Sequence, residues 1–245
     1  MKPIIPVHRL RRQARLISRK QGLPLHAALD RIAAGEGFRN WSHMVAKFSS
    51  AGGGKYAVAG NAPQVYARLA PGELVLLGAR PGEGKTLMGL GLVAEAVKAG
   101  HRGAFFTLEY TERDVLEQLK KIGFELASLS PAFQLDCSDM IHGEHVARAL
   151  GRPPRGTLAI VDYLQLLDQR RENPPLNEQV RILKRFAREN GATLVMLSQI
   201  DRSYDPSVKP FPDIADIRLP NPLNLTLFDK MCFLSHGEVR FREAA

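Results

Sequence analysis

Hydrophobic residues follow two different patterns along the chain. Over residues 1–50 they recur every three or four positions, which is the spacing of one face of an α-helix. Gly22 can end a first helix, and Pro24 can begin a second. The apolar positions of three such stretches are Val7, Leu10, Ala14 and Ile17, then Leu25, Ala28, Leu29 and Ile32, and then Phe38, Trp41, Met44, Val45 and Phe48. This pattern predicts a small all-α module over residues 1–50, and the glycine-rich residues 51–55 predict a flexible linker.

Beyond the linker, short apolar runs alternate with amphipathic stretches. The runs that resemble buried strands are Glu73–Leu77, Ala104–Thr107, Phe133–Asp136, Leu158–Asp162, Thr193–Leu197 and Met231–Leu234. The helices expected between them include Thr86–Lys98, Glu112–Ile122 and Asn177–Asn190. Alternation of this kind is typical of a mostly parallel sheet with helices on both faces. We therefore expect residues 56–245 to form one α/β domain.

Composition limits the class of protein further. The chain is 44% hydrophobic and 24% charged, as ordinary globular proteins are. No apolar run reaches the roughly 18 residues that indicate a transmembrane helix, and the N-terminus lacks the apolar core of a secretory signal. Cys137 and Cys232 are the two cysteines, too few for a disulfide scaffold. These features predict a cytoplasmic protein with no membrane association.

The positive charge is concentrated near the N-terminus. The net charge of the chain is +9. Residues 1–55 contain eleven Lys or Arg and two acidic residues, whereas residues 56–245 contain 23 basic and 23 acidic residues. Such asymmetry favours an arm that binds a polyanion such as nucleic acid. A solvated helix surface that aids solubility would have the same composition, so both interpretations stay open.

The stretch GARPGEGKT at residues 78–86 resembles a phosphate-binding loop but departs from the strict pattern. That pattern places Gly four residues before Gly-Lys-Ser/Thr, and here Ala79 holds this position while Gly78 lies one place earlier. An expected strand precedes the loop and an expected helix follows it, so backbone N–H groups can surround an anion. The predicted nucleotide-binding residues are Ala79, Arg80, Pro81, Gly82, Glu83, Gly84, Lys85 and Thr86. Lys85 would contact the β- and γ-phosphates, and Thr86 would offer its hydroxyl to Mg²⁺.

A second part of a phosphoryl-transfer site ends another apolar run. Asp162 follows Leu158–Val161, and an unpaired carboxylate at that place in a core would be costly. In P-loop enzymes an Asp at this place helps to hold Mg²⁺. We therefore expect Asp162 to act with Thr86 in binding the metal.

Four motifs in one order resemble a known family. GARPGEGKT, FFTLEYT, IVDYLQLL and LVMLSQIDRS are similar to motifs of the DnaB-type replicative helicase ATPase domain, which has a RecA-like fold. That family commonly has Ala-Arg-Pro at the start of its loop, which matches Ala79-Arg80-Pro81. The resemblance covers about residues 70–200. It implies ATP hydrolysis with Mg²⁺, assembly into a homo-oligomeric ring such as a hexamer, and action on single-stranded DNA in DNA replication.

The resemblance also implies roles for two further residues. It assigns Glu109 as the base that activates the attacking water, although an acid that favours a helix N-terminus is an alternative. It assigns Gln199 as a polar sensor of the γ-phosphate, where the alternative is a hydrogen bond at a strand end. With Lys85, these residues form the predicted catalytic set.

Three departures from the family leave the function open. The interval from Glu109 to Asp162 is short, and the closing segment lacks the polar, glycine-containing run of the helicases. No clear arginine finger follows the last strand, and Arg240 and Arg242 are the candidates. Arg170, in a long loop, could contact a DNA phosphate or be solvated, as could its neighbour Arg171. An ATP-dependent regulatory or assembly protein that does not unwind DNA is therefore the alternative.

Overall fold

The chain divides into two compact units. The computed structural model describes residues 10, 13–14, 17–18, 20–41, 44, 61–124, 131–167, 172–219 and 221–243. The two units are Met1–Gly53 and Gly54–Ala245. Among the described residues, no helix combines the length and the apolar character that crossing a membrane requires.

The N-terminal unit contains helix α2 (Leu25–Gly35), which begins directly after Pro24 as the sequence predicts. Ala28, Leu29 and Ala33 of this helix are buried. They belong to a small core that also contains Leu10, Ala14, Trp41 and Met44. Trp41 is therefore a core residue, and its backbone N–H donates a hydrogen bond to Asp30 Oδ1 at 2.9 Å. Val7, Val45, Phe48 and the linker 51–55 lie outside the described residues.

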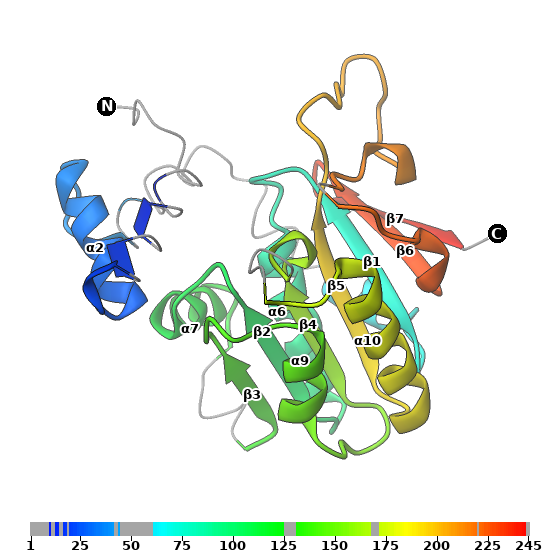
Figure 1. Cartoon of the computed structure of the whole chain (residues 1–245). Helices are drawn as coiled ribbons and strands as arrows, with labels where there is room; N and C mark the ends of the chain where they lie inside the picture. The colour runs from blue at the N-terminus through cyan, green and yellow to red at the C-terminus, as the bar shows by residue number, and fades with distance from the viewer. Residues whose placement is uncertain are drawn as a thin grey trace. The chain divides into compact units, whose positions relative to one another are not determined.

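The larger unit is built on one sheet, shown in Figure 1. Its strands are β1 (Leu74–Ala79), β2 (Gly103–Thr107), β3 (Phe133–Asp136), β4 (Leu158–Asp162), β5 (Thr193–Gln199), β6 (Lys230–Ser235) and β7 (Glu238–Glu243). Their order is β3-β2-β4-β5-β1-β6-β7, and all neighbours are parallel except β6 and β7. The six strands predicted from apolar runs are confirmed, with shifts of at most two residues at their ends.

Strand β7 was not predicted, because it does not form a continuous apolar run. It pairs with β6 as an antiparallel hairpin whose turn contains His236 and Gly237, both with positive φ. Val239 and Phe241 pack on the core, while Arg240 between them is exposed. An edge strand covered on one side alternates apolar and polar residues, so its signal is weaker than that of a central strand.

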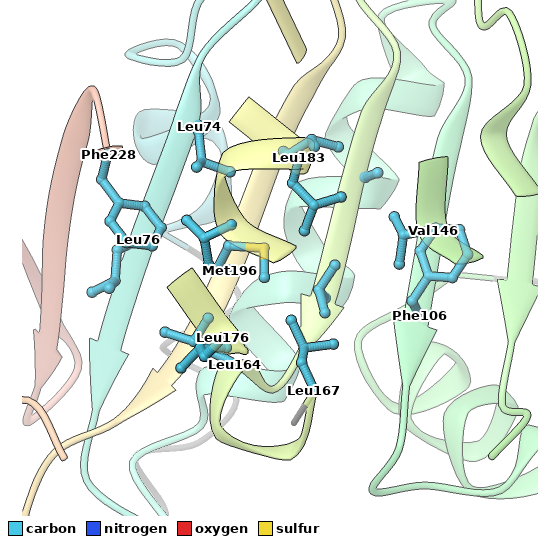
Figure 2. Packing of buried hydrophobic residues seen from close by; sticks show 14 of the residues in the cluster. Leu74, Leu76, Phe106, Val146, Leu164, Leu167, Leu176, Leu183, Met196 and Phe228 are labelled. Atoms are coloured by element: carbon cyan, nitrogen blue, oxygen red, sulfur yellow. The ribbon is translucent and has the colours of Figure 1, made fainter. Parts of the chain in front are cut away.

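Helices cover both faces of the sheet, because alternate residues of each strand point to opposite faces. One face packs against α5 (Ala62–Tyr66), α6 (Lys85–Lys98) and α7 (Glu112–Lys121). The other packs against α9 (Gly143–Leu150) and α10 (Leu176–Asn190). Figure 2 shows this second core, where Leu183 and Leu176 of α10 lie against Leu76 and Met196 of the sheet. The predicted mostly parallel α/β fold is confirmed.

Candidate nucleotide-binding and active site

The polar residues singled out in the sequence meet at the carboxyl edge of the sheet. Ala79 of β1 pairs in register with Gln199 of β5, and Thr107 of β2 pairs with Asp162 of β4. Parallel strands end at the same edge, so their C-terminal residues and the turns that follow come together there. This edge is where open α/β sheets bind ligands.

The unusual start of the loop has a packing explanation. A Cβ atom added to Gly78 would lie 2.9 Å from Cδ1 of Phe233 and 3.2 Å from Cδ1 of Ile200. Gly78 is therefore a glycine because the Phe233 ring of the neighbouring strand β6 occupies the space that a Cβ atom would need. The phosphate-binding loop itself begins one residue later at Ala79, which is completely buried. This is why the glycine falls one place early.

The rest of the loop has the backbone geometry of an anion-binding turn. Gly82 and Gly84 both have φ of +93°, a region that side chains disfavour. Gly84 immediately precedes α6, which begins at Lys85. The free N–H groups and the positive end of this helix therefore face the place where phosphate would bind.

Side chains of the loop contact two other segments. The guanidinium of Arg80 lies 5.8 Å from the centre of the Tyr204 ring, which belongs to the segment after β5. Glu83 accepts a hydrogen bond from the backbone N–H of His236, in the β6–β7 turn, at 3.0 Å. The loop is thus held from both sides by segments that follow it in the sequence.

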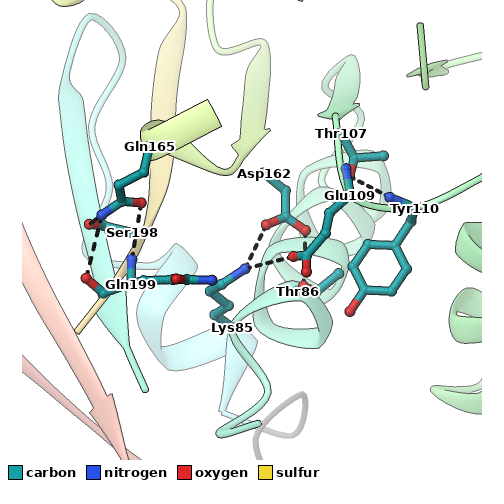
Figure 3. A network of polar contacts seen from close by, with 9 residues as sticks. All are labelled: Lys85, Thr86, Thr107, Glu109, Tyr110, Asp162, Gln165, Ser198 and Gln199. Atoms are coloured by element: carbon teal, nitrogen blue, oxygen red, sulfur yellow. Dashed lines mark hydrogen bonds and ion pairs between the residues drawn. The ribbon is translucent and has the colours of Figure 1, made fainter. Parts of the chain in front are cut away.

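Lys85, Thr86 and Asp162 form a buried polar cluster, shown in Figure 3. The ammonium group of Lys85 donates to Asp162 Oδ1 at 2.8 Å and to Glu109 Oε2 at 3.4 Å. Thr86 Oγ1 donates to Asp162 Oδ2 at 2.9 Å. Lys85 also lies 4.6 Å from the centre of the Tyr163 ring. Asp162 thus has two partners at the strand end, which offsets the cost of its burial.

The charges in this cluster shift one another's pKa. Burial alone would lower the pKa of Lys85, but the carboxylates of Asp162 and Glu109 outweigh it, so the pKa of Lys85 is raised. Burial and the negative charge of Glu109 raise the pKa of Asp162, and Lys85 opposes that rise. Lys85 therefore stays charged at neutral pH, as a ligand for phosphate must be. The hydroxyl of Thr86 and the carboxylate of Asp162 are oxygen donors of the kind that Mg²⁺ prefers, so these residues suit the metal.

Glu109 follows β2 and is positioned by a residue that the sequence analysis missed. Thr107 is fully buried, and its Oγ1 accepts hydrogen bonds from the backbone N–H groups of Glu109 (3.0 Å) and Tyr110 (3.2 Å). The side chain of Glu109 is 20% exposed and points toward Lys85. Helix α7 begins later, with Thr111 as its cap and Asp114 completing a capping box. Glu109 is thus not part of that helix cap, which favours the catalytic interpretation over the structural one.

Gln199 ends β5 beside the loop, and its backbone is held by a second missed residue. Gln165 lies in the short 3₁₀ helix η1 (Leu164–Leu166) that follows β4. Its Oε1 accepts from the N–H of Gln199 at 3.3 Å, and its Nε2 donates to Ser198 Oγ at 2.8 Å. The signal in the sequence was a glutamine within the apolar stretch after Asp162, and a buried amide requires partners.

The remaining candidates lie away from this cluster. Arg240 and Arg242 are both exposed on the edge strand β7. Arg240 pairs with Glu238 at 3.3 Å and lies 4.4 Å from the centre of the Phe211 ring. Arg170 lies outside the described residues, as does its neighbour Arg171.

The fold and site define a class of protein. The larger unit has three features of a RecA-like P-loop ATPase domain. They are the mostly parallel sheet of this order, the glycine-rich loop before the buried Lys85 and Thr86, and the acid Asp162 at the end of β4. Residues 64–213, more than half of the chain, match the family model described as "ATPase: KaiC". The chain therefore belongs to the KaiC family of ATPases.

Individual relatives confirm the resemblance seen in the motifs. The chain is 26% identical over 184 residues to the replicative DNA helicase DnaB of Mycoplasma genitalium, an alignment that covers 60% of this chain and 39% of the relative. It is 28% identical over 177 residues to the replicative DNA helicase DnaB of Synechocystis, covering 60% of this chain and 20% of the relative. The chain spans less than half of either relative. A solved structure of another ATPase domain has the same fold, with a TM-score of 0.52, 21% identity, and coverage of 68% of this chain and 70% of the other.

Proposed function

We propose that this chain hydrolyses ATP with Mg²⁺ and uses the energy as a DnaB-like translocase on single-stranded DNA. The observation that carries the proposal is the cluster of Lys85, Thr86, Glu109 and Asp162 at the carboxyl edge of the sheet. These side chains provide, within one small volume, the cation, the metal ligands and the base that phosphoryl transfer requires. The DnaB relatives support the nucleic-acid substrate.

We infer the following role for each of these residues in ATP hydrolysis. Lys85 exchanges its contact with Asp162 for one with the β- and γ-phosphates, which frees the carboxylate. Thr86 and Asp162 would hold Mg²⁺, which would neutralise the charge that develops on the phosphates. Glu109 accepts a proton from the water that attacks the γ-phosphorus, as ADP leaves. Gln199, a neutral amide at the adjacent strand end, can bond the γ-phosphate without introducing a charge.

The proposal extends to the organisation of the chain. Residues 1–50 would be a basic module that binds the DNA backbone, residues 51–55 a linker, and residues 56–245 the motor domain. The concentration of positive charge in residues 1–55 supports this division. Arg240 and Arg242 are exposed on the edge strand β7. In a homo-oligomer, such as a hexameric ring, a neighbouring subunit could contact them there.

The decisive experiment is the rate of ATP hydrolysis with and without single-stranded DNA. A translocase should turn over faster in its presence, and Lys85→Ala should abolish both rates. An oligoribonucleotide of the same sequence tests the choice of polymer. An ATP hydrolysis rate that neither polymer changes would reject the translocase. It would favour the alternative, a regulatory or assembly protein in which nucleotide binding switches partner contacts.

A further inference from the structure

The side chain of Gln165 joins three segments of the chain beside the ATP site. It is 5% exposed and lies three residues after Asp162. Its Nε2 donates to Ser198 Oγ at 2.8 Å and to the carbonyl of Arg218 at 2.7 Å, while its Oε1 accepts from the N–H of Gln199. Figure 3 shows the amide of Gln165 facing the end of β5. One buried side chain therefore connects the turn after β4, the end of β5 and the start of the next segment toward β6.

The segment between Gln199 and Arg218 is a loop whose two ends are hydrogen-bonded to each other. Ile200 and Ile217 pair as an antiparallel bridge, and the N–H of Asp201 donates to the carbonyl of Asp216 at 2.7 Å. Residues 201–216 thus leave the sheet and return to the same place. Gln165 holds both strands at this base, since it bonds the residue before Ile200 and the residue after Ile217.

Two residues of the ATP site lead directly to Gln165. Asp162 begins the turn that contains it, and Lys85, bound to Asp162, also lies over the ring of Tyr163 in that turn. Gln199, the proposed sensor, has its N–H held by the amide of Gln165. If Lys85 contacts phosphate and Asp162 holds Mg²⁺, as proposed above, the contacts at the start of this turn would change. A displacement of Gln199 toward the γ-phosphate would change the contact between its N–H and Gln165.

We propose that Gln165 is a positioning residue through which occupancy of the ATP site sets the conformation of loop 201–216. This inference rests on the proposed nucleotide site. The amide is suited to the role because it can donate to the carbonyl of Arg218 on one side of the loop base while it accepts from the N–H of Gln199 on the other. Removing it leaves the carbonyl of Arg218 and the N–H of Gln199 without this partner, so the two ends of the loop lose their common connection to Asp162.

Hydrogen–deuterium exchange of the full chain, with and without Mg²⁺ and a non-hydrolysable ATP analogue, tests the proposal. In the parent protein the analogue should slow exchange in residues 78–90 and change it in residues 200–218. In Gln165→Met, protection of residues 78–90 should remain and the change in residues 200–218 should disappear. Gln179→Met is the matched control, because Gln179 is also buried and its amide bonds Gly143, Leu167 and Pro174 instead. This control should respond like the parent.

A second variant covers the case in which Gln165→Met does not fold. Gln165→Glu keeps the volume and the acceptor for Gln199, but places an oxygen against the carbonyl of Arg218. The response of residues 200–218 should disappear in this variant too. If residues 78–90 of the parent show no protection, the nucleotide site itself is wrong and the coupling fails with it. If they are protected but residues 200–218 do not respond, or respond equally in parent and variants, the role of Gln165 is refuted while the ATP site stands.

Discussion

The ammonium group of Lys85 lies 2.8 Å from the carboxylate of Asp162, and the two side chains are 8% and 0% exposed. Lys85, the predicted ligand of the β- and γ-phosphates, thus forms a buried ion pair in this structure. If Asp162 is a metal ligand, as proposed, this contact would neutralise its carboxylate until phosphate competes for the lysine. In the proposed mechanism, binding of ATP and Mg²⁺ would be an exchange of partners within one buried cluster.

Substituting Lys85 should affect stability as well as binding. Lys85→Ala removes the cation that contacts phosphate and leaves Asp162 buried without its charge partner, a change that costs about 3–5 kcal/mol. We expect undetectable binding of a fluorescent ATP analogue and a lower free energy of unfolding in urea. Adding Asp162→Asn should restore much of the stability but not the binding. Lys98→Ala, at the exposed end of α6, serves as the control, and equal stability of the two lysine variants would contradict the ion pair.

Glu109→Gln should separate binding from turnover. The amide keeps the shape of the side chain but cannot accept the proton of the attacking water, so ATP hydrolysis should fall by about 10²–10⁴-fold. Affinity for Mg·ATP, measured by titration calorimetry, should stay close to that of the parent. Glu112→Gln, an exposed acid in the first turn of α7, should hydrolyse ATP normally. Turnover at the parental rate in Glu109→Gln would leave Glu109 with a structural role.

Thr107 should influence catalysis through the position of Glu109. Thr107→Val keeps the shape but removes the acceptor of two backbone N–H groups, so the turn that carries Glu109 can shift. A misplacement of about 1 Å can cost roughly 10²-fold in kcat. Thr107→Ser retains the oxygen and should restore the rate. A decrease in nucleotide affinity rather than in kcat in Thr107→Val would show that the hydroxyl acts on binding instead.

Substitutions of Gly78 and Ala79 should have different effects on the protein. Gly78→Ala forces a methyl group against Phe233 and should destabilise the fold by about 1–3 kcal/mol. Ala79→Gly, which creates the strict loop pattern, should not improve nucleotide affinity, because the loop already has its geometry. Thermal unfolding and ATP-analogue binding measure the two effects. Phe233→Leu combined with Gly78→Ala should recover stability, and failure to do so would reject the packing explanation.

The basic N-terminal module should contribute to the salt dependence of DNA binding. Each phosphate of a single strand that the protein no longer neutralises should reduce the slope of log affinity against log salt by about 0.7. Lys20→Gln with Arg31→Gln removes two exposed charges of this unit, so the slope should fall by about 1.4. Lys120→Gln with Lys121→Gln removes two exposed charges of α7 as the control. Equal slopes in both double variants, measured by fluorescence anisotropy, would indicate that loops of the ATPase domain hold the DNA.

The sequence by itself determined six of the seven strands of the sheet and several of the residues at its carboxyl edge. Central strands are continuous apolar runs, and the polar residue that ends such a run is visible without knowledge of its neighbours. Asp162 was found in this way, Lys85 through the glycine-rich turn before it, and Gln199 through the resemblance of its motif to the helicase family. These are local signals, because a buried parallel strand needs apolar side chains on both faces until it reaches the site.

The tertiary structure decided what those residues touch. Gly78 is explained by Phe233 and Gln165 by Arg218, contacts between residues far apart in the chain. The ion pair of Lys85 with Asp162 is of the same kind. Such contacts depend on the order of the strands in the sheet. That order cannot be read from the spacing of residues along the sequence. Strand β7 was also a result of the structure, because an edge strand needs an apolar residue only at every second position to cover the core.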